Sequence, residues 1–267
     1  MASLAAEGID VGLHALRLLP VAALSPFLGG PLLPPLARGA LALALGAAVR
    51  ALLGGSAGPP LSGLALTAAA ARELAFGAGL AVLASIPIEA ARGAGRLADT
   101  LRGATLGELH VAPIRQQETA LGDLLVQWTL ALASWAGADR LIVAALLDTF
   151  RALPVGAPLP AHALLAAGAD GAGELVAAAF CLGAPAAAGI LCAEIALAVA
   201  SRVAPRAGLG GGAPAVRAAI GLVAVALPAA AMGGRLVELT ALSAGLLSGL
   251  GPAGTGPGIS VGRGLAP

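Results

Sequence analysis

The stretch LVAAAFCLGAPAAAGILCA, residues 175–193, decides the fold class of this chain. It carries no charged side chain, and an acidic residue bounds it on each side, at Glu174 and Glu194. A helix needs about 20 mostly apolar residues to cross the hydrocarbon core of a bilayer. The length and composition of this window therefore predict a membrane-spanning helix, interrupted by two glycines and by Pro185.

The composition of the whole chain also favours a membrane protein. Of its 267 residues, 58% are hydrophobic and 11% are charged, whereas soluble domains have roughly 25% charged residues. The 39 glycines and 19 prolines predict irregular joints between helices. A net charge of +1 gives no basic surface for nucleic acid, which excludes a nucleic-acid partner. We predict an all-α, polytopic membrane-associated protein of broken, kinked apolar helices.

The other apolar windows are rich in alanine, which makes their insertion into lipid weak. One buried methyl or methylene group contributes only about 0.8 kcal/mol. Residues 18–37 contain no charged side chain, but their five prolines exclude one straight helix. Residues 39–49 are typical of an alanine/leucine helix. Helices of this kind are expected to need partner helices from neighbouring subunits, against which small side chains can pack closely.

The predicted organisation is one helical domain followed by a tail. The domain covers residues 1–250, and the Gly/Pro-rich residues 251–267 are expected to be flexible. Residues 154–173 are expected to form a loop between the halves of the domain. Cys181 and Cys192 have no metal-binding spacing, so we expect two small buried side chains on one face of a helix.

Charge is concentrated in a central segment, residues 86–123, IPIEAARGAGRLADTLRGATLGELHVAPIRQQETALGD. On a helix, spacings of three and four residues place one set of side chains on one face: Glu89, Arg92, Arg96, Asp99 and Gly103. Charges in lipid are costly unless they are paired or lie beside water. This face is therefore either an inter-helix contact, the wall of a polar conduit, or the solvated face of an interfacial helix.

Several short motifs, in a fixed order, resemble those of a known family. Residues 94–103, AGRLADTLRG, resemble its stretch AG-x-x-x-D-x-x-RG, which includes Gly95 and Arg102. Pro113 and residues 120–125, ALGDLL, resemble the proline and the SxLGxLL segment that follow it. The family is the T subunit of the bacterial type III secretion export apparatus (SctT), with its flagellar relative FliR.

Three further stretches carry the same resemblance. Residues 72–77, RELAFG, look like the family's KE-x-x-x-G element, and residues 148–154, DTFRALP, look like its S-[FY]-x-x-x-P ending, which closes at Pro154. The run aP…[DE]…R-x-aP of its penultimate helix is matched by four residues: Pro185, Glu194, Arg202 and Pro205. Asp99 and Arg102 favour the injectisome branch over the flagellar one.

The resemblance implies a structural, channel-forming subunit in the bacterial inner (plasma) membrane. Such a subunit packs with the R and S subunits into a hetero-oligomeric helical export gate, contacts the switch subunit U and the export-gate protein V, and helps export unfolded proteins. Its partners would be these subunits, the unfolded substrates and membrane lipid. The residues expected to build the gate are those of the charged face and of the motifs quoted above.

No catalytic, metal or cofactor site is predicted. The chain has no lysine, which excludes a Walker lysine, and its three histidines are far apart. His110 is expected in a loop or packing role, with pH sensing as its alternative. Glu194 is expected to pair with Arg202 or another subunit, with proton relay as its alternative. The competing functions are a small-solute secondary transporter, a flagellar export-gate subunit and a scaffold without a conduit.

Overall fold

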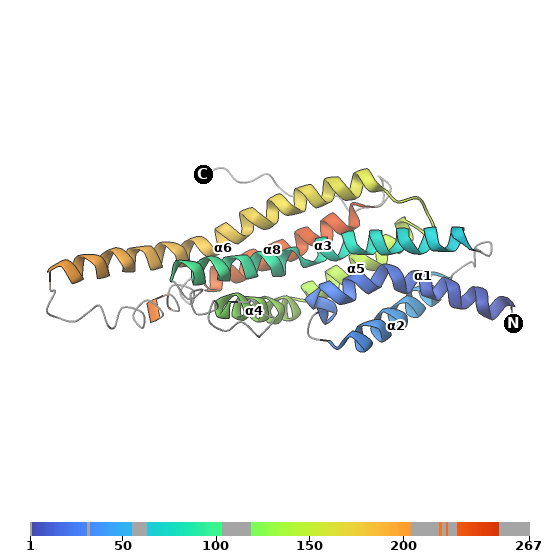
Figure 1. The fold of residues 1–267 in the computed structure, drawn as a ribbon, viewed down its shortest axis with the longest axis horizontal. Coiled ribbons are helices and arrows are strands. Elements are labelled where there is room, and N and C mark those ends of the chain that lie inside the picture. The colour runs from blue at the N-terminus through green and yellow to red at the C-terminus, as the bar shows by residue number, and fades with distance from the viewer. Residues whose placement is uncertain are drawn as a thin grey trace. The chain divides into compact units, whose positions relative to one another are not determined.

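The computed structural model describes residues 2–30, 33–54, 63–102, 119–203, 219–220, 223 and 229–250. Within these residues the chain forms seven α-helices and one short 3-10 helix and no strand, which confirms the all-α prediction (Figure 1). The elements are α1 (Ala2–Leu24), η1 (Pro26–Leu28), α2 (Pro35–Leu53), α3 (Leu64–Leu101), α4 (Ala120–Ala136), α5 (Ala138–Ala152), α6 (Ala161–Val203) and α8 (Ala229–Ser248).

Prolines divide the N-terminal apolar region into two helices, as predicted for residues 18–37. Helix α1 ends at Leu24, η1 begins at Pro26, and α2 begins at Pro35. Helices α1 and α2 form an antiparallel pair (Figure 1). A side chain at Gly46 of α2 would place its Cβ 2.7 Å from the backbone nitrogen of Ala15, so glycine allows the two helices to approach closely.

In the part of the chain that the structure describes, three helices are long and apolar enough to cross a membrane: α2, α3 and α6. Helix α6 contains the window 175–193, which confirms a helix long and apolar enough to span, but the predicted interruption is wrong because α6 continues through Pro185. Helices α4 and α5 are separated at Gly137, whose φ is 69°, and by length and composition the two together could form a fourth, broken span. Among the described residues there are thus three helices, or four with this broken pair, that are able to span a bilayer, and the break lies at a glycine.

Two further details of the sequence prediction are wrong. Residues 154–173 are not one loop, because α6 begins at Ala161, where a run rich in alanine and leucine favours helix over the glycines within it. Cys181 and Cys192 do lie on α6, but both are exposed rather than buried. Only 22% of the apolar window in α6 is buried in the single chain.

The chain divides into two compact units. The first consists of Met1–Ser85, Ala138–Gly171 and Thr240–Pro267, and the second of Ile86–Gly137 and Ala172–Leu239. In the first unit a small core joins α1, α2 and α5 through Leu18, Val49 and Phe150. In the second unit the core joins α3, α4, α6 and α8. The prediction of one domain with a tail stays a prediction, and residues 251–267 lie outside the described residues.

Candidate functional site: charged residues at two helix ends

In the first unit, Arg17 of α1 and Glu73 of α3 form an ion pair that is almost completely buried. The Arg17 Nε donates to Glu73 Oε2 at 2.7 Å, and the two residues are 1% and 2% exposed. The guanidinium also lies over two aromatic rings, 5.0 Å from the centroid of Phe76 and 4.4 Å from that of Phe150. We call these four residues the Arg17 cluster. Its rings cover a cation whose charge is matched by one carboxylate.

The Arg17 cluster closes the C-terminal end of α5. Arg17 Nη1 donates to the carbonyl oxygen of Leu153 at 2.8 Å and to that of Thr149 at 3.4 Å. The last carbonyls of a helix have no partner within the helix, and they carry the negative end of its dipole. Glu73 Oε1 accepts from the backbone nitrogen of Gly156 at 2.9 Å, just after this end. A buried cation and its carboxylate thus satisfy the backbone groups where α5 stops.

Helix α3 comes so close to α1 here that only glycine fits at residue 77. A Cβ at Gly77 would collide with the backbone carbonyl of Arg17. Glu73 and Gly77 are one helical turn apart, so the carboxylate and the gap lie on the same face of α3. Both belong to the RELAFG stretch, and Thr149, Phe150 and Leu153 belong to DTFRALP. Two stretches that carried the family resemblance therefore meet around Arg17.

Arg17 itself was missed by the sequence analysis. It stands in a mostly apolar run, and its three polar contacts come from residues 56 to 136 positions away. The one available signal was a single arginine among apolar residues before a proline-rich segment, since such a charge must find a partner inside a membrane protein.

A second polar contact extends from this cluster along α1. His14 stacks on Phe150, with 5.5 Å between ring centroids, and its Nδ1 lies 2.8 Å from the carbonyl oxygen of Asp10. The Asp10 carboxylate accepts from Arg50 Nε of α2 at 2.8 Å. Helix α1 is therefore joined by charged or aromatic side chains to α2, α3 and α5.

In the second unit, Asp99 of α3 lies at the N-terminal end of α4. Asp99 is 1% exposed, and its Oδ2 accepts from the backbone nitrogen of Leu121 at 2.9 Å. Its other oxygen forms an ion pair with Arg102. The first backbone N–H groups of a helix have no partner within the helix and carry the positive end of its dipole, which a carboxylate stabilises. Asp99 is therefore a capping residue for α4 as well as a partner of Arg102.

Gly95, one turn before Asp99, makes this contact sterically possible. A Cβ at Gly95 would lie 2.5 Å from the Cα of Gly122 in the first turn of α4. Because both positions are glycine, the start of α4 can lie directly against the backbone of α3. The AGRLADTLRG and ALGDLL stretches thus meet at what we call the Asp99 junction, formed by Gly95, Asp99, Leu121 and Gly122.

Thr119 provides a second cap at the same helix end, and its removal gives a testable expectation. Its side-chain oxygen accepts from the backbone nitrogen of Gly122 at 3.2 Å. We expect Thr119→Ala to lower the free energy of unfolding by about 1 kcal/mol, whereas Thr119→Ser keeps the hydroxyl and most of this stability. Chemical unfolding in detergent, followed by circular dichroism, measures both. Equal stability of the two variants would contradict the capping role.

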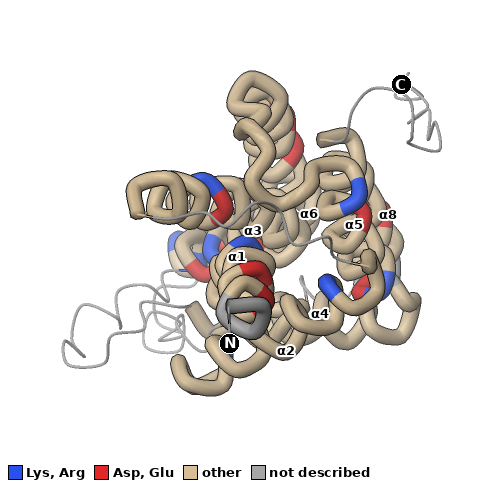
Figure 2. The backbone as a smooth tube through the Cα atoms, turned by 90° about the vertical axis from the view of Figure 1, so that its right-hand side faces the viewer, with Lys and Arg blue, Asp and Glu red and all other residues tan. Residues whose placement is uncertain are grey.

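The predicted charged face of α3 is only partly observed. Asp99 is buried while Arg96 is exposed, so the charged residues do not share one environment. Glu89 and Arg92 form their own ion pair, three residues apart. The segment is therefore a series of local pairs, Glu89 with Arg92 and Asp99 with Arg102, because a charge three positions away is reached at little cost in side-chain entropy. Figure 2 shows the charged residues as short blue and red stretches, several of them next to each other, while the other described residues are tan.

The remaining predicted gate residues form none of the contacts described above or lie outside the described residues. Pro154 is exposed after α5, and Pro185 and Arg202 are exposed on α6, whereas Glu194 on α6 is half-buried. Gly103, Pro113, Pro205 and His110 lie outside the described residues. In the part of the chain that the structure describes, there is no group of three or more His, Cys, Asp or Glu side chains placed to hold a metal ion.

These features define a class of protein: a polytopic helical membrane protein in which buried charged side chains bind the backbone groups at the end of α5 and at the start of α4. The sequence profile of the family described as "Bacterial export proteins, family 1" matches residues 9–241. The chain belongs to this family and is a component of a bacterial export apparatus. As such a component, it assembles with other components of the apparatus. The comparison with curated proteins gives no match.

Proposed function

We propose that the chain is the T subunit of a type III secretion export apparatus in the bacterial inner membrane. It assembles with the R and S subunits, contacts the switch subunit U and the export-gate protein V, and forms with them the channel through which unfolded proteins leave. The observation that supports this proposal is the Asp99 junction, where the two most family-like stretches of the chain meet at a buried carboxylate.

The exposed apolar surface gives independent support for assembly. Side chains on α6 such as Phe180, Ile195 and Val203 are 62%, 65% and 79% exposed. A helix that is apolar on its exposed face requires lipid or another helix to cover it. Small, alanine-rich helices gain little from lipid alone, so helices of neighbouring subunits are the favoured cover.

The proposed role of the Asp99 junction is tested by charge reversal. In Asp99→Arg, two cations lie side by side at the positive end of the α4 dipole, in a buried place, so the start of α4 should detach. We expect secretion and recovery of the assembled complex to fall at least tenfold. Glu7→Arg is the matched control, because Glu7 is exposed on α1. Equal secretion by both variants would remove the junction from the mechanism.

Purification of the chain, alone and with its candidate partners, distinguishes between the alternative functions. The proposed subunit is expected to be recovered in quantity only together with the R and S subunits, and to transport no small solute by itself. A chain that is stable alone and carries a solute across vesicle membranes would be a secondary transporter instead. Secretion of flagellar rather than effector proteins, measured in the culture medium, would place the chain in the flagellar branch.

A further inference from the structure

Helix α5, in the first unit, has one face inside the protein and one face outside it. Its buried side chains include Ile142, Leu146 and Phe150. Phe150 shares a core with Leu18 of α1 and Val49 of α2. The charged residues of α5 lie outside this core: Asp139 is half-buried, and Arg140, Asp148 and Arg151 are exposed. The apolar face of α5 therefore packs against α1 and α2, and its charges are left outside.

The exposed charges of α5 form a continuous face. Four exposed residues follow one another at spacings of four, four and three, which places them in one row along the helix: Arg140, Ala144, Asp148 and Arg151. Asp148 and Arg151 form an ion pair at 2.8 Å, and each side chain is more than half exposed. We call this row the α5 outer face. It has the continuity that the charged residues of α3 lack.

The packing of α5 against a candidate span gives the outer face a depth. Val49 of α2 and Phe150 of α5 share one apolar core, and Leu45 and Leu147 pack against it. Val49 and Leu45 lie four and eight residues before the end of α2, roughly 6 and 12 Å at 1.5 Å per residue. The 19 residues of α2 cover roughly 28 Å, about the thickness of the hydrocarbon core. Asp148, between Leu147 and Phe150 in the chain, is therefore at hydrocarbon depth when α2 spans the bilayer.

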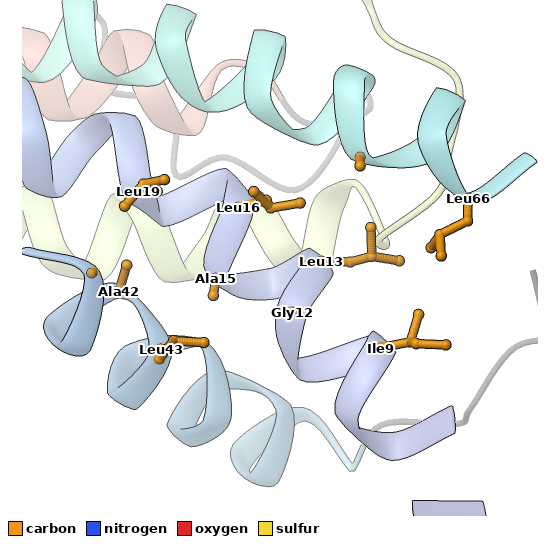
Figure 3. Close-up of a pocket in the computed structure, with 11 residues that line it drawn as sticks. Ile9, Gly12, Leu13, Ala15, Leu16, Leu19, Ala42, Leu43 and Leu66 are labelled. Atoms are coloured by element: carbon orange, nitrogen blue, oxygen red, sulfur yellow. The ribbon is translucent and has the colours of Figure 1, made fainter. Parts of the chain in front are cut away.

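Lipid is an unfavourable cover for this face. A charged side chain in hydrocarbon is costly unless it lies beside water or a partner, and only long side chains extend to the membrane surface, which Asp148 cannot do. The groove between α1 and α2 has the opposite composition. Ile9, Leu16 and Leu43 belong to the eleven residues that line it, none of which is charged (Figure 3). Lipid or an apolar helix can cover that groove, but the α5 outer face requires a polar surrounding.

The core of a subunit interface is also unfavourable for these charges. Charged residues are depleted from the buried core of interfaces, and water reaches the rim where they do occur. Where this chain buries an ion pair, it supplies further partners, since Arg17 also donates to two carbonyls and Glu73 accepts from a backbone nitrogen. Asp148 and Arg151 have no such additional partner among the described residues. Burying them would remove their water without replacing it.

We propose that the α5 outer face borders a water-filled recess at the depth of the membrane spans. Helix α5 is then a polar wall rather than the lipid-facing half of a broken span. A polar wall was one interpretation of the charged face of α3, whose charges form local pairs instead. The inference depends on α2 spanning the membrane and not on the proposed secretion function, so the two can fail separately.

Two alanines provide a matched test of hydration. Ala144 lies on the α5 outer face, and Ala44 is an exposed residue at the middle of α2. Ala144→Cys and Ala44→Cys are made in a chain whose natural cysteines, Cys181 and Cys192, are replaced by alanine. The full chain, extracted with the subunits that accompany it, is placed in phosphatidylcholine nanodiscs. It is then treated with a sulfonated maleimide, whose charge keeps it out of lipid.

We expect Ala144→Cys to be labelled at least about tenfold faster than Ala44→Cys, because the reacting thiolate forms only where water solvates its charge. In dodecyl sulfate, which unfolds the chain, the two cysteines should react equally. Labelling of Ala144→Cys as slow as that of Ala44→Cys would overturn the proposal, and a rate that rises only in the isolated chain would identify a subunit as the cover. Fast labelling of both would overturn it too, because α2 would then not lie in lipid.

Exchange of the two paired charges distinguishes water from a charged partner surface. Asp148→Arg combined with Arg151→Asp keeps the pair and the net charge, so a hydrated face should allow recovery of the assembled complex within about twofold of the natural level. Arg17→Glu combined with Glu73→Arg is the matched control. The further partners of that buried pair fit only one order, so recovery should fall at least about tenfold. A tenfold loss in the α5 exchange would show that a subunit with complementary charges covers the face, contrary to the proposal.

Discussion

Glu73→Ala is expected to lower the free energy of unfolding by about 3–5 kcal/mol, the usual cost of removing one partner of a buried ion pair. The variant leaves the guanidinium of Arg17 buried beside two aromatic rings without a carboxylate. It also removes the acceptor for the backbone nitrogen of Gly156. Chemical unfolding of the full chain in detergent, together with its co-extracted subunits, measures the loss.

An exposed ion pair in the same unit is the control for this expectation. Asp148 and Arg151 are paired at 2.8 Å on α5, with side chains 53% and 68% exposed. Because water solvates these charges well, Asp148→Ala should change the stability by less than about 1 kcal/mol. Comparable losses in Glu73→Ala and Asp148→Ala would mean that burial does not determine the strength of the Arg17 cluster.

A double variant separates the charge from the packing. Arg17→Met removes the cation and keeps a long side chain, whose sulfur can contact Phe76 and Phe150. Combined with Glu73→Ala, it leaves no uncompensated charge, so the double variant should be more stable than the sum of the single losses by about 1–3 kcal/mol. Strict additivity would contradict a direct interaction between residues 17 and 73.

The fold class could be predicted from the sequence because it depends on local properties. Charge-free apolar windows predict helices able to span a membrane. Prolines mark the boundary between α1 and α2, since Pro26 follows the end of α1 and Pro35 begins α2, whereas α6 continues through Pro185. The exposed state of Cys181 and Cys192 could not be predicted in this way. Burial depends on which helices pack against α6, and its small side chains specify no single partner.

The two buried clusters could be predicted from the sequence to different degrees, because their partners lie at different distances along the chain. Asp99 stood out because an acid in an apolar protein needs a partner, and Arg102 lies only three residues away. Its role as a cap of α4 could not be inferred, since Leu121 is 22 positions away along the chain. Arg17 has only distant partners, so its importance became visible when α1, α3 and α5 were seen together.

The second large effect is expected at the Asp99 junction, where Gly95→Ala should destabilise the protein by about 1–3 kcal/mol. The added Cβ would lie 2.5 Å from the Cα of Gly122, a distance that only backbone movement can relieve. Moving α4 away also lengthens the 2.9 Å contact between Asp99 and the backbone nitrogen of Leu121. The steric and capping losses therefore occur together. Chemical unfolding measures the total, and hydrogen exchange of the Leu121 amide reports on the cap.

Gly234 of α8 provides the opposite expectation for the same substitution. A Cβ there has no atom within 4 Å, so Gly234→Ala should stabilise the protein by about 0.5–1 kcal/mol through helix propensity alone. The two alanine variants thus differ in the sign of their effect, which a general response to alanine cannot produce. Stabilisation by Gly95→Ala would mean that α3 and α4 are not in direct backbone contact, and the capping role of Asp99 would fail with it.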